Sequence, residues 1–185
     1  MPLPEIIGRS LIHKGRKFDF ESLTIRQPSG RVMTREIVKH PGAVVIVPVL
    51  PDGRVVLIRV FRISLGKMSQ ECCAGTREAG EDPAECAARE LIEETGFKAD
   101  RLVKLATFFT SPGLSDEAMH AFVATGLTHV GQDLEEDEHI EVELVAAEEV
   151  LQRLDRGEIA DGKSMVALLL AQRQGWLAPS GPPGP

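Results

Sequence analysis

One segment constrains the fold of this chain more than any other: the stretch from Gly75 to Phe97, which reads GTREAGEDPAECAARELIEETGF. Asp82 offers a side-chain acceptor suited to a helix N-cap, and Pro83 suits the first turn that follows. Gly96 is placed to end the helix in the left-handed conformation that glycine adopts without strain. The segment therefore predicts a loop followed by a helix between Asp82 and Gly96.

The predicted helix has one small, largely apolar face and one acidic face. At about 100° per residue, the apolar face comprises Ala84, Ala87, Ala88, Leu91, Ile92 and Thr95. Glu90 and Glu94 stand one turn apart on another face, with Glu93 beside them, and carboxylates at this spacing repel one another. Arg89 offsets part of that repulsion, and a hard divalent cation such as Mg²⁺ would resolve it better. A solvated acidic helix face is the alternative interpretation of the glutamates taken alone.

The full pattern is more specific than the glutamates. It consists of Gly75, five residues, Glu81, seven residues, and then Arg89-Glu90-Leu91-x-Glu93-Glu94-x-Gly96-Phe97. This pattern resembles the Nudix box at every defined position, so the chain is similar to the Nudix hydrolases, which cleave nucleoside diphosphates linked to another moiety. The resemblance implies a loop–helix–loop packed on a mixed sheet.

The same resemblance implies roles for individual residues. Glu90 and Glu94 would be metal ligands together with the carbonyl oxygen of Ala74, and Glu93 a nearby ligand or base. Arg89 would orient the glutamates, and Glu81 would tie the loop to the helix. The expected cofactor is Mg²⁺, with Mn²⁺ as a substitute and more than one ion in each site.

Length, charge and cysteine content narrow the protein class. A chain of 185 residues with 43% hydrophobic and 26% charged residues is expected to form one soluble domain, or one domain with a small extension. The net charge of −7 argues against a general nucleic-acid binder. Three cysteines without zinc spacing suggest reduced thiols, with Cys72 and Cys73 as small buried residues. We find no signal peptide or membrane span and expect a cytoplasmic protein.

The remaining sequence predicts a series of strands followed by two helices near the C-terminus. Residues 17–39 predict two strands joined by the turn Pro28-Ser29-Gly30, a layer too poor in large apolar side chains to be stable alone. Residues 43–50 predict a buried central strand. Further strands are expected at 54–62, 71–74, 102–110, 118–125 and 140–145, helices at 147–154 and 163–174, and a polar connection at 63–70.

This order predicts an α/β fold in which helices cover both sides of the sheet, and the Nudix resemblance implies the same α/β/α sandwich with a mixed sheet. Residues 1–39 are expected to form an N-terminal antiparallel β layer that serves in dimerisation, and residues 40–175 the Nudix domain. Residues 176–185 are rich in proline and glycine and are expected to be a disordered tail.

Segments before and after the Nudix box indicate which substrate to expect. Pro112, fifteen residues after Phe97 and followed by Gly113, resembles the proline of the ADP-ribose pyrophosphatase subfamily. The segments around Arg35-Glu36, Arg59 to Arg62 and Asp161-Gly162-Lys163 are similar to the same subfamily. In its members the N-terminal strands commonly exchange contacts across a homodimer, which leads us to expect a homodimer here.

Three of the candidate substrate-binding residues, Arg35, Arg62 and Phe18, have two interpretations. Arg35 and Arg62 can bind phosphate through a planar fork of donors, or they form surface ion pairs. Phe18 or Phe20 could stack on adenine, although a core role suits both. The expected substrate-binding set is Arg35, Glu36, Arg62, Phe18, Pro112 and Gly113.

The acidic stretch QDLEEDEHIE supplies a candidate base. Water that attacks phosphorus needs a carboxylate to position or deprotonate it. Glu138 matches the loop glutamate that serves this role in ADP-ribose pyrophosphatases, with Glu135, Glu136 and Glu141 close enough to be alternatives. A plain charged loop is the other interpretation.

The sequence thus predicts a metal-dependent enzyme that hydrolyses the pyrophosphate bond of ADP-ribose, or a close nucleoside diphosphate sugar, to AMP and ribose 5-phosphate. Two alternatives stay open. One is a Nudix hydrolase of another substrate, such as GDP-mannose, a dinucleoside polyphosphate or NADH. The other is a non-catalytic module that senses ADP-ribose.

Overall fold

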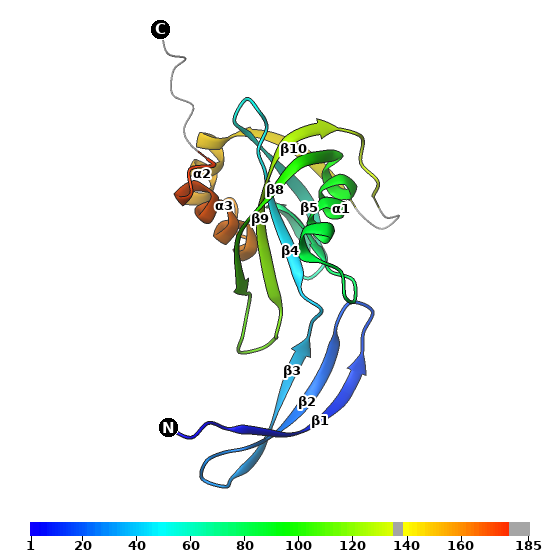
Figure 1. Cartoon of the computed structure of the whole chain (residues 1–185), viewed down its shortest axis with the longest axis vertical. Coiled ribbons are helices and arrows are strands. Elements are labelled where there is room, and N and C mark those ends of the chain that lie inside the picture. The colour runs from blue at the N-terminus through cyan, green and yellow to red at the C-terminus, as the bar shows by residue number, and fades with distance from the viewer. Residues whose placement is uncertain (135–138, 178–185) are drawn as a thin grey trace. The chain divides into compact units, whose positions relative to one another are not determined.

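The computed structural model describes residues 1–134 and 139–177 (Figure 1). The chain divides into two compact units. One consists of Met1–Gly42 together with Phe108–Ala118, and the other of Ala43–Thr107 together with Met119–Pro185. The loop that contains Pro112 and Gly113 therefore belongs to the N-terminal unit.

The N-terminal unit is a three-stranded antiparallel sheet of order β1-β2-β3. Its strands are β1 (Glu5–Lys14), β2 (Asp19–Arg26) and β3 (Val32–Lys39). The predicted hairpin is present as β2 and β3, but β1 was not predicted. Register shifts between Ile6 and Gly8 and between Leu11 and His13 interrupt its alternation of side chains, and such bulges hide a strand from a period of two.

This sheet buries little apolar surface within its own unit. Among the described residues of the unit, Leu23 is the one buried hydrophobic side chain. Side chains about half exposed include Ile6, Leu11, Ile12, Phe18 and Val32. The segment Phe108–Ala118 joins β3 through the Val38 amide, which donates to the carbonyl of Leu114 at 2.9 Å, and through the ion pair of Lys39 with Asp116.

The second unit contains two sheets. A four-stranded sheet has the order β7-β4-β9-β8, built from β7 (Cys73–Thr76), β4 (Ala43–Pro48), β9 (Ala118–His129) and β8 (Phe97–Phe109). A three-stranded sheet has the order β10-β5-β6, built from β10 (Ile140–Ala146), β5 (Arg54–Arg62) and β6 (Lys67–Glu71). Strand β4 lies antiparallel to β7 and parallel to β9, and all six of its residues are buried, as expected of a central strand in a mixed sheet.

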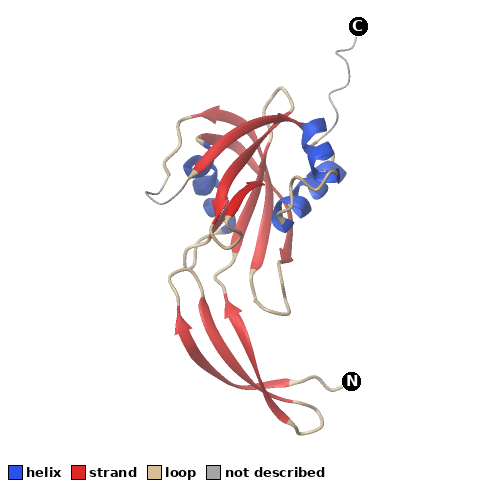
Figure 2. Ribbon diagram, turned by 180° about the vertical axis from the view of Figure 1, so that it is seen from behind, coloured by secondary structure: helices blue, strands red, loops and turns tan. Residues whose placement is uncertain are grey.

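Helices cover both sides of these sheets (Figures 1 and 2). They are α1 (Pro83–Thr95), α2 (Ala147–Asp155) and α3 (Gly162–Arg173). Helix α1 packs on β7 and β4, α3 also contacts β4, and α2 packs on β5 and β10. The predicted α/β/α sandwich with a mixed sheet and an N-terminal antiparallel layer is confirmed.

Two local predictions were wrong. The polar connection expected at 63–70 contains most of β6, an edge strand that pairs with β5 alone and therefore needs no apolar alternation. The buried face of α1 is rotated toward the glutamates, because Ala88 is exposed while Cys86 and Glu94 are buried. The helix thus turns acidic residues, as well as apolar ones, toward the sheet.

The cysteines and the C-terminal residues complete the description. Cys72, Cys73 and Cys86 are free and buried, and burial raises the pKa of the Cys72 thiol to about 12. Leu177 is buried, whereas the rest of the predicted tail, residues 178–185, lies outside the described residues. Within residues 1–134 and 139–177, no helix is long and apolar enough to cross a bilayer.

Gly96→Ala is expected to destabilise the protein by more than the strain of the left-handed backbone conformation alone. Gly96 has φ 72°, and an added Cβ would lie 2.9 Å from backbone atoms of Gly131 and Gln132. Gly157 has the same φ of 72° with nothing within 4 Å, so Gly157→Ala is the matched control. In urea denaturation we expect the control to lose about 1 kcal/mol of unfolding free energy and Gly96→Ala at least about 1 kcal/mol more. Equal losses would contradict the close contact.

Candidate active site

Strand β7, the loop after it and helix α1 form the framework of the site. The Asp82 carboxylate accepts a hydrogen bond from the Ala84 amide at 2.8 Å, as the N-cap prediction requires. At the other end, Gly96 adopts the left-handed conformation and its amide donates to the carbonyl of Ile92 at 2.8 Å. Both ends of the helix are therefore fixed by local sequence.

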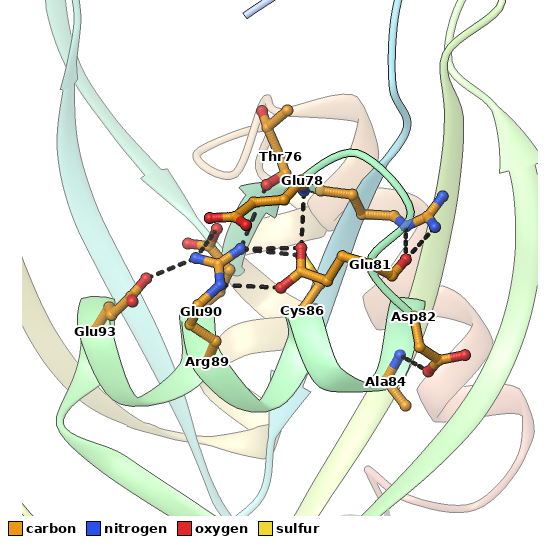
Figure 3. Close-up of polar contacts among 10 residues, drawn as sticks. Thr76, Glu78, Glu81, Asp82, Ala84, Cys86, Arg89, Glu90 and Glu93 are labelled. Carbon is orange, nitrogen blue, oxygen red and sulfur yellow. Dashed lines mark hydrogen bonds and ion pairs between the residues drawn. The ribbon is translucent and has the colours of Figure 1, made fainter.

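Arg89 holds the acidic side chains of the loop and helix together (Figure 3). Its Nη1 donates to Glu90 Oε1 and to Glu93 Oε2, each at 2.8 Å. Its Nε donates to Glu81 Oε1 at 3.0 Å, and Glu81 Oε2 accepts from the Glu78 amide at 2.8 Å. The hydrogen bond from Arg89 lowers the pKa of Glu81. Glu81 thus links the loop to the helix, and one guanidinium balances only part of the surrounding negative charge.

Glu90 and Glu94 lie directly against the backbone of β7. Glu94 Oε2 accepts a hydrogen bond from the Ala74 amide at 2.9 Å, and the Glu94 side chain is 6% exposed. A Cβ built on Gly75 would stand 1.8 Å from the carboxyl carbon of Glu90. Only a glycine leaves room for the carboxylate at that position. The structure therefore brings together Ala74, Glu90, Glu93, Glu94 and Arg89 from the predicted catalytic and metal-binding set.

A family model described as the NUDIX domain matches residues 39–168 of this chain. The chain belongs to the Nudix family. An ADP-ribose pyrophosphatase from Bacillus subtilis (strain 168) is 38% identical over 90% of this chain and 91% of its own length. A GDP-mannose pyrophosphatase from Yersinia enterocolitica is 32% identical over 89% and 90% of the two chains. The predictions of a Nudix hydrolase and of an enzyme are confirmed.

A solved structure supports the fold of this Nudix protein. The crystal structure of an ADP compounds hydrolase matches it with a TM-score of 0.81, covering 95% of this chain and 97% of the other. The two sequences are 24% identical, so this likeness concerns the fold.

The donor set of the Nudix site suits a hard divalent cation. Nudix hydrolases use divalent metal ions in general. Glu90 and Glu94 offer carboxylate oxygens, and neighbouring β7 offers backbone oxygens. Among the residues that the structure describes, no three His, Cys, Asp or Glu side chains converge on one metal position. Carboxylate and backbone oxygens are the ligands that hard divalent cations take in proteins.

A second charged cluster surrounds Glu71, whose side chain is 2% exposed at the end of β6. Glu71 accepts two hydrogen bonds from Arg62, at 2.8 and 2.6 Å, and is also paired with Lys163. Burial raises the pKa of Glu71, but the hydrogen bonds and charges of Arg62 and Lys163 outweigh burial and hold it at about 2. The ion-pair interpretation of Arg62 therefore needs refinement, because its partner is buried rather than on the surface.

The loop after β9 begins on the backbone of the Nudix helix. The Gln132 side chain donates to the carbonyl of Glu94 at 2.7 Å, and the Asp133 amide donates to the carbonyl of Glu93 at 3.1 Å. The candidate base Glu138 lies outside the described residues, as do Glu135 and Glu136. Glu141 is exposed in β10 and paired with Arg59.

The other predicted substrate-binding residues belong to the N-terminal unit. Arg35 and Glu36 are exposed on β3, and Pro112 and Gly113 are exposed in the segment that joins β3. Phe18 is half exposed and stacks against His40, with ring centroids 6.4 Å apart, so it is not a core residue of its unit. Of the six, only Arg62 lies in the unit that contains the Nudix helix.

Sequence reasoning missed Glu71, Lys163 and Gln132. Glu71 and Lys163 are separated by 92 positions in the chain, so no local spacing pairs them. The sequence offered one indication that Glu71 is buried and paired: this charged residue comes immediately before the buried pair Cys72-Cys73.

Gly75→Ala is expected to weaken metal binding with little loss of stability. The new methyl group displaces the flexible end of Glu90 rather than backbone, so the fold tolerates it while the carboxylate moves. We expect affinity for Mn²⁺, measured by calorimetry, to fall by about tenfold or more, with the unfolding midpoint nearly unchanged. Gly162→Ala, at an open position of α3, is the control. Unaltered Mn²⁺ affinity in Gly75→Ala would show that Glu90 does not bind the ion.

Proposed function

We propose that this chain is a Mg²⁺-dependent hydrolase that splits the pyrophosphate bond of ADP-ribose, giving AMP and ribose 5-phosphate. The observation that carries the proposal is the placement of Glu90 and Glu94 against the backbone at Ala74 and Gly75. The similarity to an ADP-ribose pyrophosphatase over nine-tenths of both chains supports the choice of substrate.

Glu90, Glu94 and the carbonyl oxygen of Ala74 are the residues that would hold the cation, with Mn²⁺ as a substitute and more than one ion in the site. A divalent ion bound there would neutralise charge on the phosphate oxygens and lower the pKa of a bound water. Arg89 keeps the glutamates in place through its bonds to Glu90 and Glu93.

Proton transfer requires a carboxylate near the attacking water. We assign this role to Glu138, in the acidic loop that begins at Gln132 and Asp133 on the backbone of Glu94 and Glu93. Glu93, whose side chain is 35% exposed, is the second candidate.

The candidate substrate-binding residues differ in the contacts that they offer. Arg62 offers donors to phosphate, and Arg35 and Glu36 offer polar contacts on β3. Phe18, which is half exposed beside His40, offers its ring for stacking on adenine, and Pro112 and Gly113 are assigned from the segment that joins β3. The half-exposed apolar side chains of β1 to β3 support a homodimer, and the free thiols fit a cytoplasmic enzyme.

The similarity to a GDP-mannose pyrophosphatase favours GDP-mannose as the second candidate substrate. A panel of ADP-ribose, GDP-mannose, a dinucleoside polyphosphate and NADH, assayed with and without Mg²⁺, separates the possibilities. We expect ADP-ribose to give the highest kcat/KM and every rate to require the metal. Faster cleavage of GDP-mannose would replace the substrate, and no cleavage of any compound would favour a sensing module.

Glu94→Gln is expected to reduce kcat by at least about 100-fold, because the carboxylate charge that would hold the cation is lost. The amide oxygen of the new side chain can still accept from the Ala74 amide, so the fold should persist. The measurement is steady-state hydrolysis of ADP-ribose with saturating Mg²⁺, and exposed Glu85→Gln on the same helix is the control. Near-normal turnover in Glu94→Gln would remove Glu94 from the metal site.

Glu138→Gln is expected to give a smaller but clear loss of kcat, about 10-fold to 100-fold, as is typical when a general base is removed. The same substitution at Glu135 and at Glu141 tests the choice of residue. The loss should also flatten the acidic limb of the pH–rate profile. If Glu135→Gln or Glu141→Gln proves the sensitive variant, the base lies at that position instead.

A further inference from the structure

The cluster around Glu71 is built from three separate elements of the Nudix unit. Arg62 is the last residue of β5, Glu71 is the last residue of β6, and Lys163 lies in the first turn of α3. A carboxylate that is 2% exposed is rarely tolerated in a protein unless it is paired, and Glu71 has two cationic partners.

The bond pattern fixes the orientation of Arg62. Its Nε and Nη2 both donate to Glu71, so one edge of the planar guanidinium is held in a two-point contact. Nη1 takes no part in that contact, and the Arg62 side chain is 37% exposed. One edge of the group is therefore anchored against a buried partner while the other remains available to an anion.

Glu71 is itself held in place by residues at the start of α3. Lys163 contacts both Glu71 and Asp161, and Asp161 caps α3 by accepting from the Ser164 amide at 3.0 Å. The hydroxyl of Ser164 accepts from the Cys72 amide at 2.8 Å, directly beside Glu71 in the chain. Side chain and backbone at Glu71 are thus both tied to the start of α3.

The cluster also lies within electrostatic reach of the Nudix helix. The hydrogen bonding that Arg62 donates to Glu71 is the main cause that raises the pKa of Arg62, and the charge of Glu94 contributes to the same rise. Glu71 also stands three residues before Ala74 in the chain, and the Ala74 amide donates to Glu94 at 2.9 Å. This short connection places the Arg62 cluster close to the carboxylates assigned to the cation.

Stability alone is a weak reason for such a cluster. Burying an ion pair costs desolvation energy that its Coulomb attraction often fails to exceed, and apolar side chains of similar size are commonly no worse. A fixed guanidinium, in contrast, loses little side-chain freedom when it binds a phosphate, which improves affinity.

We propose that Glu71 is a positioning residue, which holds Arg62 so that its open edge binds the diphosphate group of the substrate, with Lys163 fixing Glu71 from the other side. The inference deepens the proposed function and rests on it. It concerns a diphosphate-binding contact, and that contact can be measured without catalysis.

The test is calorimetric binding of α,β-methylene-ADP, whose diphosphate bridge is not hydrolysed, in the presence of Mg²⁺. Glu71→Gln keeps the size of the side chain but loses its charge, and Arg62→Lys keeps the charge but loses the two-point contact. We expect each to weaken binding by about tenfold, and the double variant to bind no more weakly than Arg62→Lys alone, because the two residues act as one unit. Glu149→Gln, which breaks an ion pair with Arg153 on α2, should bind like the wild type.

The other possible results of these experiments decide whether the inference holds. A lower unfolding midpoint in Glu71→Gln with unchanged affinity would overturn the inference, and so would additive losses in the double variant. If Glu71→Gln does not fold, Glu71→Asp, which keeps the charge but withdraws it by one methylene, must still weaken binding for the inference to hold. Wild-type protein that binds the analogue but does not cleave ADP-ribose would reject the proposed substrate while leaving the inference standing. Wild-type protein that does not bind it would overturn the inference.

Discussion

The site depends on how closely helix α1 approaches strand β7. Glu94 reaches the Ala74 amide at 2.9 Å, and Glu90 occupies the space where Gly75 has no side chain. Apolar contacts accompany these polar ones, because Ala87 and Leu91 on the same helix are fully buried. The acidic residues are therefore part of the packing surface of α1, and any change that moves the helix away from β7 also separates the carboxylates from the strand.

Two charge clusters of opposite character lie in the Nudix unit. Around Arg89, one cation is shared among the carboxylates of Glu81, Glu90 and Glu93. Around Glu71, one carboxylate is shared between Arg62 and Lys163. The first has excess negative charge and suits a metal ion, whereas the second has an exposed guanidinium edge and suits an anion. Binding a diphosphate together with its metal ion requires both kinds of cluster.

Local sequence predicted those parts of the fold that depend on local physics. Asp82 and Gly96 defined both ends of α1, and the apolar run from Ala43 defined the central strand. Strand β1 could not be predicted because its bulges break the alternation, and β6 because an edge strand has no apolar pattern. Buried Glu94 is bonded to the Ala74 amide, and the missing side chain at Gly75 makes room for Glu90. Both are tertiary contacts that helical periodicity cannot show. The pairing of Glu71 with Lys163 could not be predicted either, because the two residues lie far apart in the chain.

Gln132 and Asp133 attach the chain after β9 to helix α1 through hydrogen bonds to the carbonyls of Glu94 and Glu93. The chain is therefore held at the helix by the first two residues of the acidic stretch. Substitutions after Asp133 can therefore change the charge of that stretch without moving helix α1, which carries Glu90 and Glu94. The two hydrogen bonds thus uncouple the composition of the acidic stretch from the position of the proposed metal ligands.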